Sequence, residues 1–197
     1  DCEIAQSEAV YNQNPANYWV HTNMLTLNGR KMSKSSGNFI LPENLFNGNS
    51  ELIEKGFDPM VVKFLMYQAH YRNTLDLSNE SLLAAEKGYK KLTQSFHYID
   101  NLRPSNDENV EYESIIKKCY ESMLDDFNSP KLISHLFEIS KLIEDVKKKK
   151  KFMSKKSISE LKSHLRLFLI DILGFSIDGI DNRKIDNSNE LINAMIE

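Results

Sequence analysis

The sequence predicts a mostly α-helical protein in which a short segment containing strands precedes an antiparallel bundle of helices. After residue 78, apolar residues recur at every third or fourth position in four stretches separated by short polar links. Such stripes bury their apolar faces against one another, which favours a bundle. Before residue 40, short apolar and aromatic stretches flank Asn28-Gly29, a pair typical of tight turns between strands.

Composition limits the class of protein. The formal net charge is -3, so a nucleic-acid partner would have to bind a local basic surface rather than the whole molecule. Cys2 and Cys119 are too far apart for a CxxC motif, and their rarity is typical of a cytoplasmic protein without disulfides. The first residues lack the pattern of a signal peptide, and no apolar run reaches the length of a membrane span. We therefore expect a cytoplasmic protein, with no membrane partner.

The first forty residues are expected to form one helix, followed by a hairpin or by a strand that exits into a loop. A short amphipathic helix is predicted over 3–11. Residues 17–21 and 24–27 are rich in aromatic and apolar side chains and are expected to be extended. Asn28-Gly29 predicts a turn that leads directly into the sequence KMSKS at 31–35.

Two helices are predicted in the segment that follows. Residues 50–56 are interpreted as a short helix. Asp58 as the N-cap and Pro59 as the first helical residue mark a clear start for a second helix over 59–71.

The remaining chain is interpreted as helical throughout. Ser157 with Glu160 resembles a capping box, Gly174 is a candidate C-cap, and residues 190–197 would begin a further helix. The four apolar stripes run over 82–99, 112–123, 132–146 and 158–172.

The sequence KMSKS carries the most specific chemical signal. Lys31 and Lys34 place two ammonium groups three residues apart, among the hydroxyls of Ser33 and Ser35. Ammonium groups, hydroxyls and loop N–H groups together suit a mobile loop that closes over a polyphosphate and stabilises charge growing during a reaction. The alternative is a solvated basic turn. We call residues 31–38 the lysine loop.

Several motifs together resemble one family. The lysine loop continues into Gly37-Asn38-Phe39, and further matches occur in a fixed order along the chain. In this order the sequence is similar to the cysteinyl-tRNA synthetases, which are class I aminoacyl-tRNA synthetases. The other matching segments are Ile4 to Ala9, Tyr18 to His21, His70 to Arg72, Leu75 to Ser78 and Asp125 to Pro130.

The resemblance implies a domain organisation. Residues 1–49 would form the end of a Rossmann-type catalytic domain, 50–77 a connecting region that contacts the tRNA, and 78–197 a helical anticodon-binding bundle. The HIGH motif of this family does not occur in the sequence, and both ends resemble cuts through helices. We therefore expect a fragment of a longer protein that is inactive by itself.

The resemblance also implies a reaction. Such enzymes activate cysteine with ATP and magnesium to cysteinyl-AMP, releasing pyrophosphate, and then transfer the cysteinyl group to the 3' end of tRNA(Cys). Lys34 would bind ATP and stabilise the departing pyrophosphate, with Lys31 assisting, and Ser33 and Ser35 would contact the phosphates. The family is mostly monomeric, so a monomer is expected.

A zinc ion selects cysteine in this family, and the resemblance places one of its ligands at Glu3. The other ligands would precede Asp1, and Cys2 matches no ligand position. Trp19 and His21 are candidates for the pocket that holds adenylate or cysteine, with a buried core tryptophan and a satisfied histidine as the alternative.

Some interpretations stay open from sequence. His70, Tyr71 and Arg72 could contact tRNA or tie the connecting helix to its neighbour, and the run 147–151 could bind RNA or form a solvated helix end. A cysteine:amino-sugar ligase shares the zinc site and the lysine loop, and is one alternative function. A non-catalytic tRNA-binding module is the other.

Overall fold

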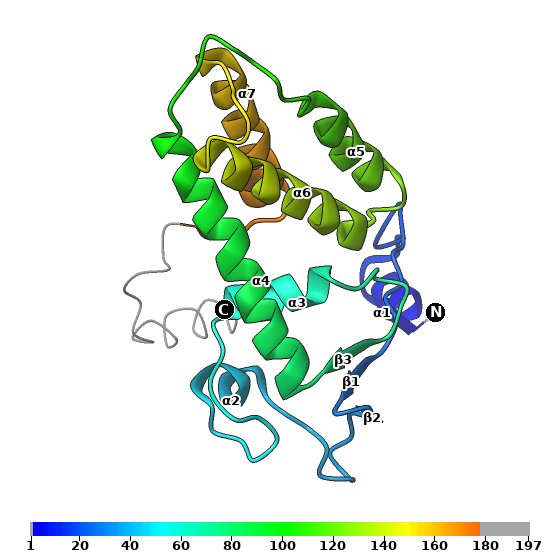
Figure 1. Cartoon of the computed structure of the whole chain (residues 1–197). Helices are drawn as coiled ribbons and strands as arrows, with labels where there is room; N and C mark the ends of the chain where they lie inside the picture. The colour runs from blue at the N-terminus through cyan, green and yellow to red at the C-terminus, as the bar shows by residue number, and fades with distance from the viewer. Residues whose placement is uncertain (1, 178–197) are drawn as a thin grey trace.

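The computed structural model describes residues 2–177, and it confirms the predicted mostly helical fold (Figure 1). A small mixed sheet lies at one end and a group of long helices at the other. A 3-10 turn, Ile99–Asn101, extends the fourth helix, and a π-helical segment, Leu167–Ile172, extends the last one. The elements are α1 Cys2–Tyr11, β1 Leu25–Leu27, β2 Arg30–Lys31, α2 Pro42–Asn47, α3 Pro59–Tyr67, β3 Leu75–Leu77, α4 Asn79–Tyr98, α5 Glu113–Leu124, α6 Ser129–Lys147 and α7 Lys155–Arg166.

The sheet has the strand order β2-β1-β3. Strand β1 pairs antiparallel with β2, and the predicted turn between them is confirmed because Asn28 and Gly29 both have positive φ, 53° and 72°. This conformation is the one that a two-residue hairpin turn requires. Strand β1 also pairs in parallel with β3, with Thr26 opposite Asp76. The chain between β1 and β3 therefore contains the lysine loop, α2 and α3.

The helix predicted at 50–56 is wrong. Residues 51–55 form turns, and the helix of this region is α2 instead. Helix α2 ends at Gly48, whose φ is 80°, and the chain then folds back so closely that a Cβ on Gly56 would lie 2.4 Å from the Phe46 carbonyl oxygen. The segment is therefore held by the close approach of Gly56 to Phe46 and by the buried side chain of Ile53, and not by the hydrogen bonds of a helix.

Helix α3 begins where the sequence predicts and ends earlier. The Asp58 carboxylate accepts a hydrogen bond of 2.7 Å from the Met60 N–H, which is an N-cap. The helix ends at Tyr67 rather than at residue 71, because the chain turns there to reach the sheet: the Tyr71 carbonyl accepts a bond of 2.8 Å from the Asn23 N–H.

Helices α4 to α7 form the predicted bundle. Helix α6 lies in its centre and packs against both α4 and α5, while α3 crosses α4 on the side of the sheet (Figure 1). Helix α4 starts at a capping box made by Ser78 and Ser81. Most residues of the predicted stripes are buried, whereas Phe96, Met123 and Ile158 are half-buried and Ile172 is 39% exposed. The fully buried ones are Leu82, Ala85, Ile99, Cys119, Leu132, Leu136, Ile139, Leu161 and Phe168.

The start of α7 differs from the prediction. Its N-cap is Ser154, whose hydroxyl accepts a bond of 3.2 Å from the Ser157 N–H, so Ser157 lies inside the helix. Glu160 therefore closes no capping box, and instead accepts a bond from the Tyr112 hydroxyl. Gly174 ends this helical region with φ 62°, as predicted. The helix predicted over 190–197 falls outside the described residues.

Helix α1 confirms the predicted N-terminal helix but buries none of its residues. Val10, for example, is 71% exposed. Among residues 2–177, no helix combines the length and the apolar character that crossing a membrane requires.

Candidate functional site at the lysine loop

The lysine loop is a small second hairpin that continues from β2. Ser33 pairs with Asn38 across it, and the Ser33 N–H donates to the Asn38 carbonyl at 2.9 Å. The Gly37 N–H donates to the Lys34 carbonyl at 3.2 Å, with Gly37 at φ 70°. The tip of the loop therefore consists of residues 34–37, at the end of the molecule opposite to α7 (Figure 1).

The Asn38 side chain fastens the base of this loop. Its amide nitrogen lies 3.1 Å from the Leu27 carbonyl oxygen and 3.2 Å from the carbonyl oxygens of Arg30 and Lys31. These acceptors belong to both strands of the hairpin, so one amide group ties the loop to β1 and β2. This role of Asn38 was not predicted from the sequence, where its one signal is its place directly after Gly37 in the motif.

Asp76 of β3 holds the same hairpin from the other side. Its Oδ1 accepts bonds of 2.7 Å from the Thr26 hydroxyl and from the Gly29 N–H. The Asn28 N–H also donates to the Leu77 carbonyl at 3.0 Å. The turn that leads into the lysine loop is therefore fixed to the parallel strand.

The predicted phosphate-binding groups lie together on this loop. Lys31 and Lys34 are exposed, and neither ammonium group forms an ion pair within residues 2–177. The Lys34 ammonium lies 5.4 Å from the centre of the Phe39 ring, while the Ser33 and Ser35 hydroxyls are 2.7 Å apart. Two exposed cations and two hydroxyls on a fastened loop can bind several phosphate oxygens at once.

Trp19 and His21 lie on the segment before β1, which has no regular structure. Trp19 is 42% exposed and His21 is also exposed, so neither belongs to the hydrophobic core of the described residues. A shallow cavity of about 250 Å³ lies between this region and the end of α3, and its lining includes Thr22, Met66 and Tyr71 but neither Trp19 nor His21.

Glu3 lies in the exposed first turn of α1. Within the described part of the chain, no group of three His, Cys, Asp or Glu side chains is placed to hold a metal ion. One carboxylate gives no tetrahedral zinc shell. The described residues therefore do not form a zinc site by themselves.

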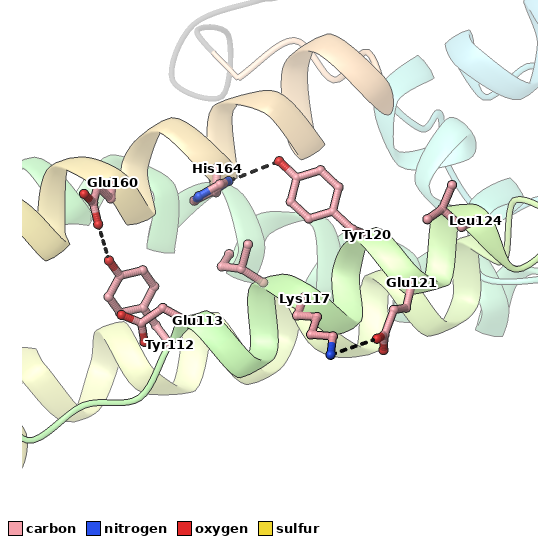
Figure 2. Close-up of a pocket in the computed structure, with 9 residues that line it drawn as sticks. Tyr112, Glu113, Lys117, Tyr120, Glu121, Leu124, Glu160 and His164 are labelled. Atoms are coloured by element: carbon pink, nitrogen blue, oxygen red, sulfur yellow. Dashed lines mark hydrogen bonds and ion pairs between the residues drawn. The ribbon is translucent and has the colours of Figure 1, made fainter.

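A second cavity lies between α5 and α7 (Figure 2), away from the end of the molecule that carries the lysine loop (Figure 1). It measures about 470 Å³ and has an apolar floor near Ile116 with polar groups at its edge. Tyr112 donates to Glu160 at 2.6 Å, and the Tyr120 hydroxyl lies 3.3 Å from His164 Nδ1. Burial, and then the bond to Glu160, raises the pKa of Tyr112 to about 12, so this hydroxyl remains a donor.

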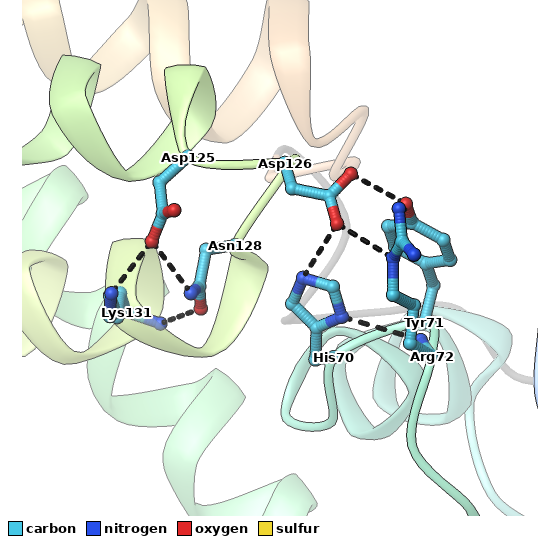
Figure 3. Close-up of polar contacts among 7 residues, drawn as sticks. All are labelled: His70, Tyr71, Arg72, Asp125, Asp126, Asn128 and Lys131. Carbon is cyan, nitrogen blue, oxygen red and sulfur yellow. Dashed lines mark hydrogen bonds and ion pairs between the residues drawn. The ribbon is translucent and has the colours of Figure 1, made fainter.

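His70, Tyr71 and Arg72 tie the segment after α3 to the turn between α5 and α6, where they meet Asp126 (Figure 3). The sequence left open whether these residues contact tRNA or attach the connecting helix to its neighbour, and the structure supports the attachment.

In the lysine run, Lys147 lies 3.9 Å above the Tyr98 ring and Lys148 pairs with Glu144. Lys149 and Lys150 are exposed after the end of α6, as in a solvated helix end.

Two parts of the chain match models of known protein families. Residues 1–87 match the catalytic domain described as tRNA synthetases class I (C), and residues 118–178 match the DALR domain. The lysine loop falls in the first match and Asp126 in the second.

Curated relatives match over nearly the whole chain. The cysteine–tRNA ligase of Parabacteroides distasonis is 44% identical over 174 residues, which are 88% of this chain and 35% of that protein. That of Phocaeicola vulgatus is 39% identical over 202 residues, covering 100% of this chain and 41% of the relative. That of Thermococcus gammatolerans is 32% identical, over 99% of this chain and 41% of the relative. The chain thus spans between 35% and 41% of the length of these relatives.

Proposed function

The chain belongs to the cysteinyl-tRNA synthetase family, and from this premise we propose that the full-length protein is a cysteine–tRNA ligase. The observation that supports this most directly is the lysine loop. Its two exposed ammonium groups lie on a hairpin that Asn38 and Asp76 fasten to the sheet, within the region that matches the catalytic domain.

The proposed reaction has two steps. A carboxylate oxygen of cysteine attacks the α-phosphorus of ATP, the bond to the bridging oxygen breaks, and pyrophosphate leaves with the bond electrons. A ribose hydroxyl at the 3' end of tRNA(Cys) then attacks the cysteinyl carbonyl and AMP leaves. ATP enters with magnesium as its counterion.

Within the first step we assign Lys34 to the departing pyrophosphate, with Lys31 beside it. Negative charge grows on the leaving group as its bond breaks, and a cation held at that position lowers the barrier. Ser33 and Ser35 would donate their hydroxyls to the remaining phosphate oxygens. All four groups lie on the lysine loop, which supports their joint assignment.

Replacing Lys34 tests this assignment. In the full-length protein, Lys34→Ala should lower the turnover of cysteine-dependent ATP–pyrophosphate exchange by about 10²- to 10³-fold, the usual effect of losing one group that binds transition-state charge. The KM for ATP should change much less, because the interaction is strongest in the transition state.

Lys87→Ala, which removes an exposed lysine of α4, serves as the control and should leave exchange unchanged. Unchanged exchange in Lys34→Ala would exclude the proposed role.

Further parts of the proposal concern the substrate pocket and the metal. We assign Trp19 and His21 to the pocket for cysteine or adenylate, since both side chains are exposed just before β1. We also propose Glu3 as one zinc ligand, in a site that the described residues do not complete, since they contain no group of three His, Cys, Asp or Glu side chains placed to hold a metal ion. Zinc analysis of full-length Glu3→Gln against wild type tests this, with a lower zinc content expected.

The division into 1–49, 50–77 and 78–197, the monomeric state and the cytoplasmic location also belong to the proposal. The two thiols support the cytoplasmic location, because both cysteines are free within the described residues.

The acceptor of the cysteinyl group distinguishes the alternatives. The match of residues 118–178 to the DALR domain favours tRNA over an amino sugar. Supplying tRNA(Cys) or an amino sugar to the full-length protein, with cysteine and ATP, separates these functions. A non-catalytic tRNA-binding module would show no exchange with either.

A further inference from the structure

One carboxylate joins the two matched regions of the chain. Asp126 lies in the turn between α5 and α6, and its Oδ1 accepts a hydrogen bond of 2.6 Å from the Tyr71 hydroxyl. Its Oδ2 lies 2.7 Å from Arg72 Nε and 3.8 Å from His70 Nε2 (Figure 3). Three consecutive side chains between α3 and β3 therefore converge on one residue of the bundle. We call these four residues the Asp126 latch.

The side chains of the latch also support each other. The His70 and Tyr71 rings stack with their centres 4.7 Å apart, and the Arg72 guanidinium lies 5.4 Å from the Tyr71 ring centre. Arg72 Nε additionally lies 3.0 Å from the Tyr71 hydroxyl. Because each group limits the rotamers of the next, the carboxylate meets a prearranged set of donors.

The latch continues to the start of β1 through backbone hydrogen bonds. The Asn23 N–H donates to the Tyr71 carbonyl at 2.8 Å, and the Asn23 side-chain amide donates to the Arg72 carbonyl at 2.8 Å. The next residue along, Met24, accepts a bond of 3.2 Å from the Leu75 N–H, and β1 follows at once. The latch is therefore linked to the start of β1, which fixes the orientation of the bundle relative to the sheet, while Asn38 and Asp76 hold the lysine loop independently of it.

The turn that carries Asp126 has an unfavourable backbone conformation. Asp126 and Phe127 both have positive φ, 53° and 54°, in a region that residues other than glycine rarely adopt. Strain of this kind persists where surrounding contacts maintain it, and it often accompanies function. The neighbouring Asp125, at the end of α5, instead pairs with Lys131 Nζ of α6 at 2.7 Å. Of these two adjacent carboxylates, only Asp126 contacts the segment between α3 and β3.

We propose that Asp126 is a positioning residue which sets the helical bundle relative to the strands of the lysine loop, so that tRNA bound by the bundle reaches the activated cysteine. This inference depends on the proposed function. The side chains of Asp126 and Arg72 are 42% and 65% exposed. Exposed ion pairs add little to stability, so the latch acts on orientation more than on folding.

The two steps of the reaction test the proposal in the full-length protein. Asp126→Asn removes the charge that Arg72 contacts, and Tyr71→Phe removes one donor while keeping the ring. Each should lower kcat/KM for tRNA in aminoacylation by about tenfold, within the usual range of coupling between sites, and leave ATP–pyrophosphate exchange within about twofold of wild type.

Asp125→Asn is the matched control, because it removes the adjacent carboxylate without touching the latch, and should leave both steps unchanged. In the double variant Asp126→Asn with Arg72→Gln, the loss should not exceed that of Asp126→Asn alone, because both changes remove one contact.

Other results would overturn the proposal. Unchanged aminoacylation in Asp126→Asn, equal losses in both steps together with a lower melting temperature, or the same loss in Asp125→Asn would each do so. If wild-type protein exchanged pyrophosphate but did not charge tRNA(Cys), or did neither, the proposed function itself would fail.

Discussion

Two polar side chains decide how firmly the lysine loop is held. The Asn38 amide donates hydrogen bonds to three backbone carbonyls of the hairpin. The Asp76 carboxylate accepts a hydrogen bond from the Gly29 N–H, in the turn that precedes the lysine loop. A typical hydrogen bond of this kind contributes about 0.5–1.5 kcal/mol to the free energy of unfolding. Holding the base of a loop while its tip stays exposed suits a segment that must bind phosphates without losing its position.

Removing the Asn38 amide should loosen the loop and slow the reaction. In full-length Asn38→Ala, we expect turnover of pyrophosphate exchange to fall by roughly tenfold, because Lys34 is then less well positioned. The free energy of unfolding should fall by about 1 kcal/mol. Steady-state kinetics and urea unfolding measure the two effects.

Asn106→Ala, at an exposed position near the end of the bundle, is the control for Asn38→Ala. Faster or unchanged exchange in Asn38→Ala would contradict a positioning role.

The latch should also give the protein a defined response to acid. Hydrogen bonds from Tyr71 and then Arg72 lower the pKa of Asp126 below its ordinary value of 3.8. Its contribution to the free energy of unfolding is therefore fully present above that value and is lost as the pH falls through the lower folded pKa. We expect stability to fall less steeply in Asp126→Asn than in wild type between about pH 5 and about pH 3.

Urea unfolding followed by circular dichroism at several pH values measures this difference. Glu111→Gln removes an exposed carboxylate elsewhere and controls for the change in net charge. Equal slopes in Asp126→Asn and wild type would show that these hydrogen bonds do not contribute to the free energy of unfolding.

At the scale of elements, apolar periodicity predicts the bundle helices because each one buries its own stripe. The stripes of α4 and α6 are buried almost completely. Helix α2 carries local signals, since Pro42 begins it and Gly48 ends it, whereas the wrong prediction of a helix at 50–56 has a tertiary cause: the close approach of Gly56 to Phe46 depends on how the chain folds back. Local sequence patterns cannot predict this contact between Gly56 and Phe46, because the two residues are brought together only by the fold.

Helix α6 should be the most sensitive element to loss of packing. Leu136 is fully buried in its middle, so Leu136→Ala should lower the free energy of unfolding by about 2–5 kcal/mol through lost apolar contact and the cavity left behind. Leu124→Ala changes the same residue type at a position that is 86% exposed, and should have an effect within about 0.5 kcal/mol. Equal effects of the two variants in urea unfolding would show that α6 is not the centre of the bundle.

At the scale of the whole molecule, the candidate site could be predicted only in part. Lys31, Lys34, Ser33 and Ser35 follow from one short motif, because they are neighbours in sequence. The latch joins Tyr71 to a residue 55 positions later, and periodicity carries no information about such a pair. The motifs containing both residues contributed to the family resemblance, but their contact required the fold.

An aromatic cluster joins the same two regions from the inside. The Phe64 ring of α3 lies 6.0 Å from Tyr89 of α4, 6.4 Å from Phe137 of α6 and 6.0 Å from Phe175, between ring centres. Gly88 leaves room for it, since a Cβ there would lie 2.9 Å from Phe64 Cε1. Phe64 is fully buried, so it stabilises the junction through packing, whereas the latch is largely exposed.

Loss of the Phe64 ring should therefore let the sheet and the helical bundle unfold independently. Phe64→Ala in the full-length protein should cost about 3–5 kcal/mol, and the sheet and the bundle should no longer unfold together. Native-state hydrogen exchange of residues 24–31 and 129–147 measures this, with the sheet opening at lower denaturant than α6 in the variant only. Phe152→Ala, at a 40% exposed position at the far end of the bundle, should leave the two regions coupled. If the regions exchange together in Phe64→Ala as well, the coupling must come from contacts other than this cluster.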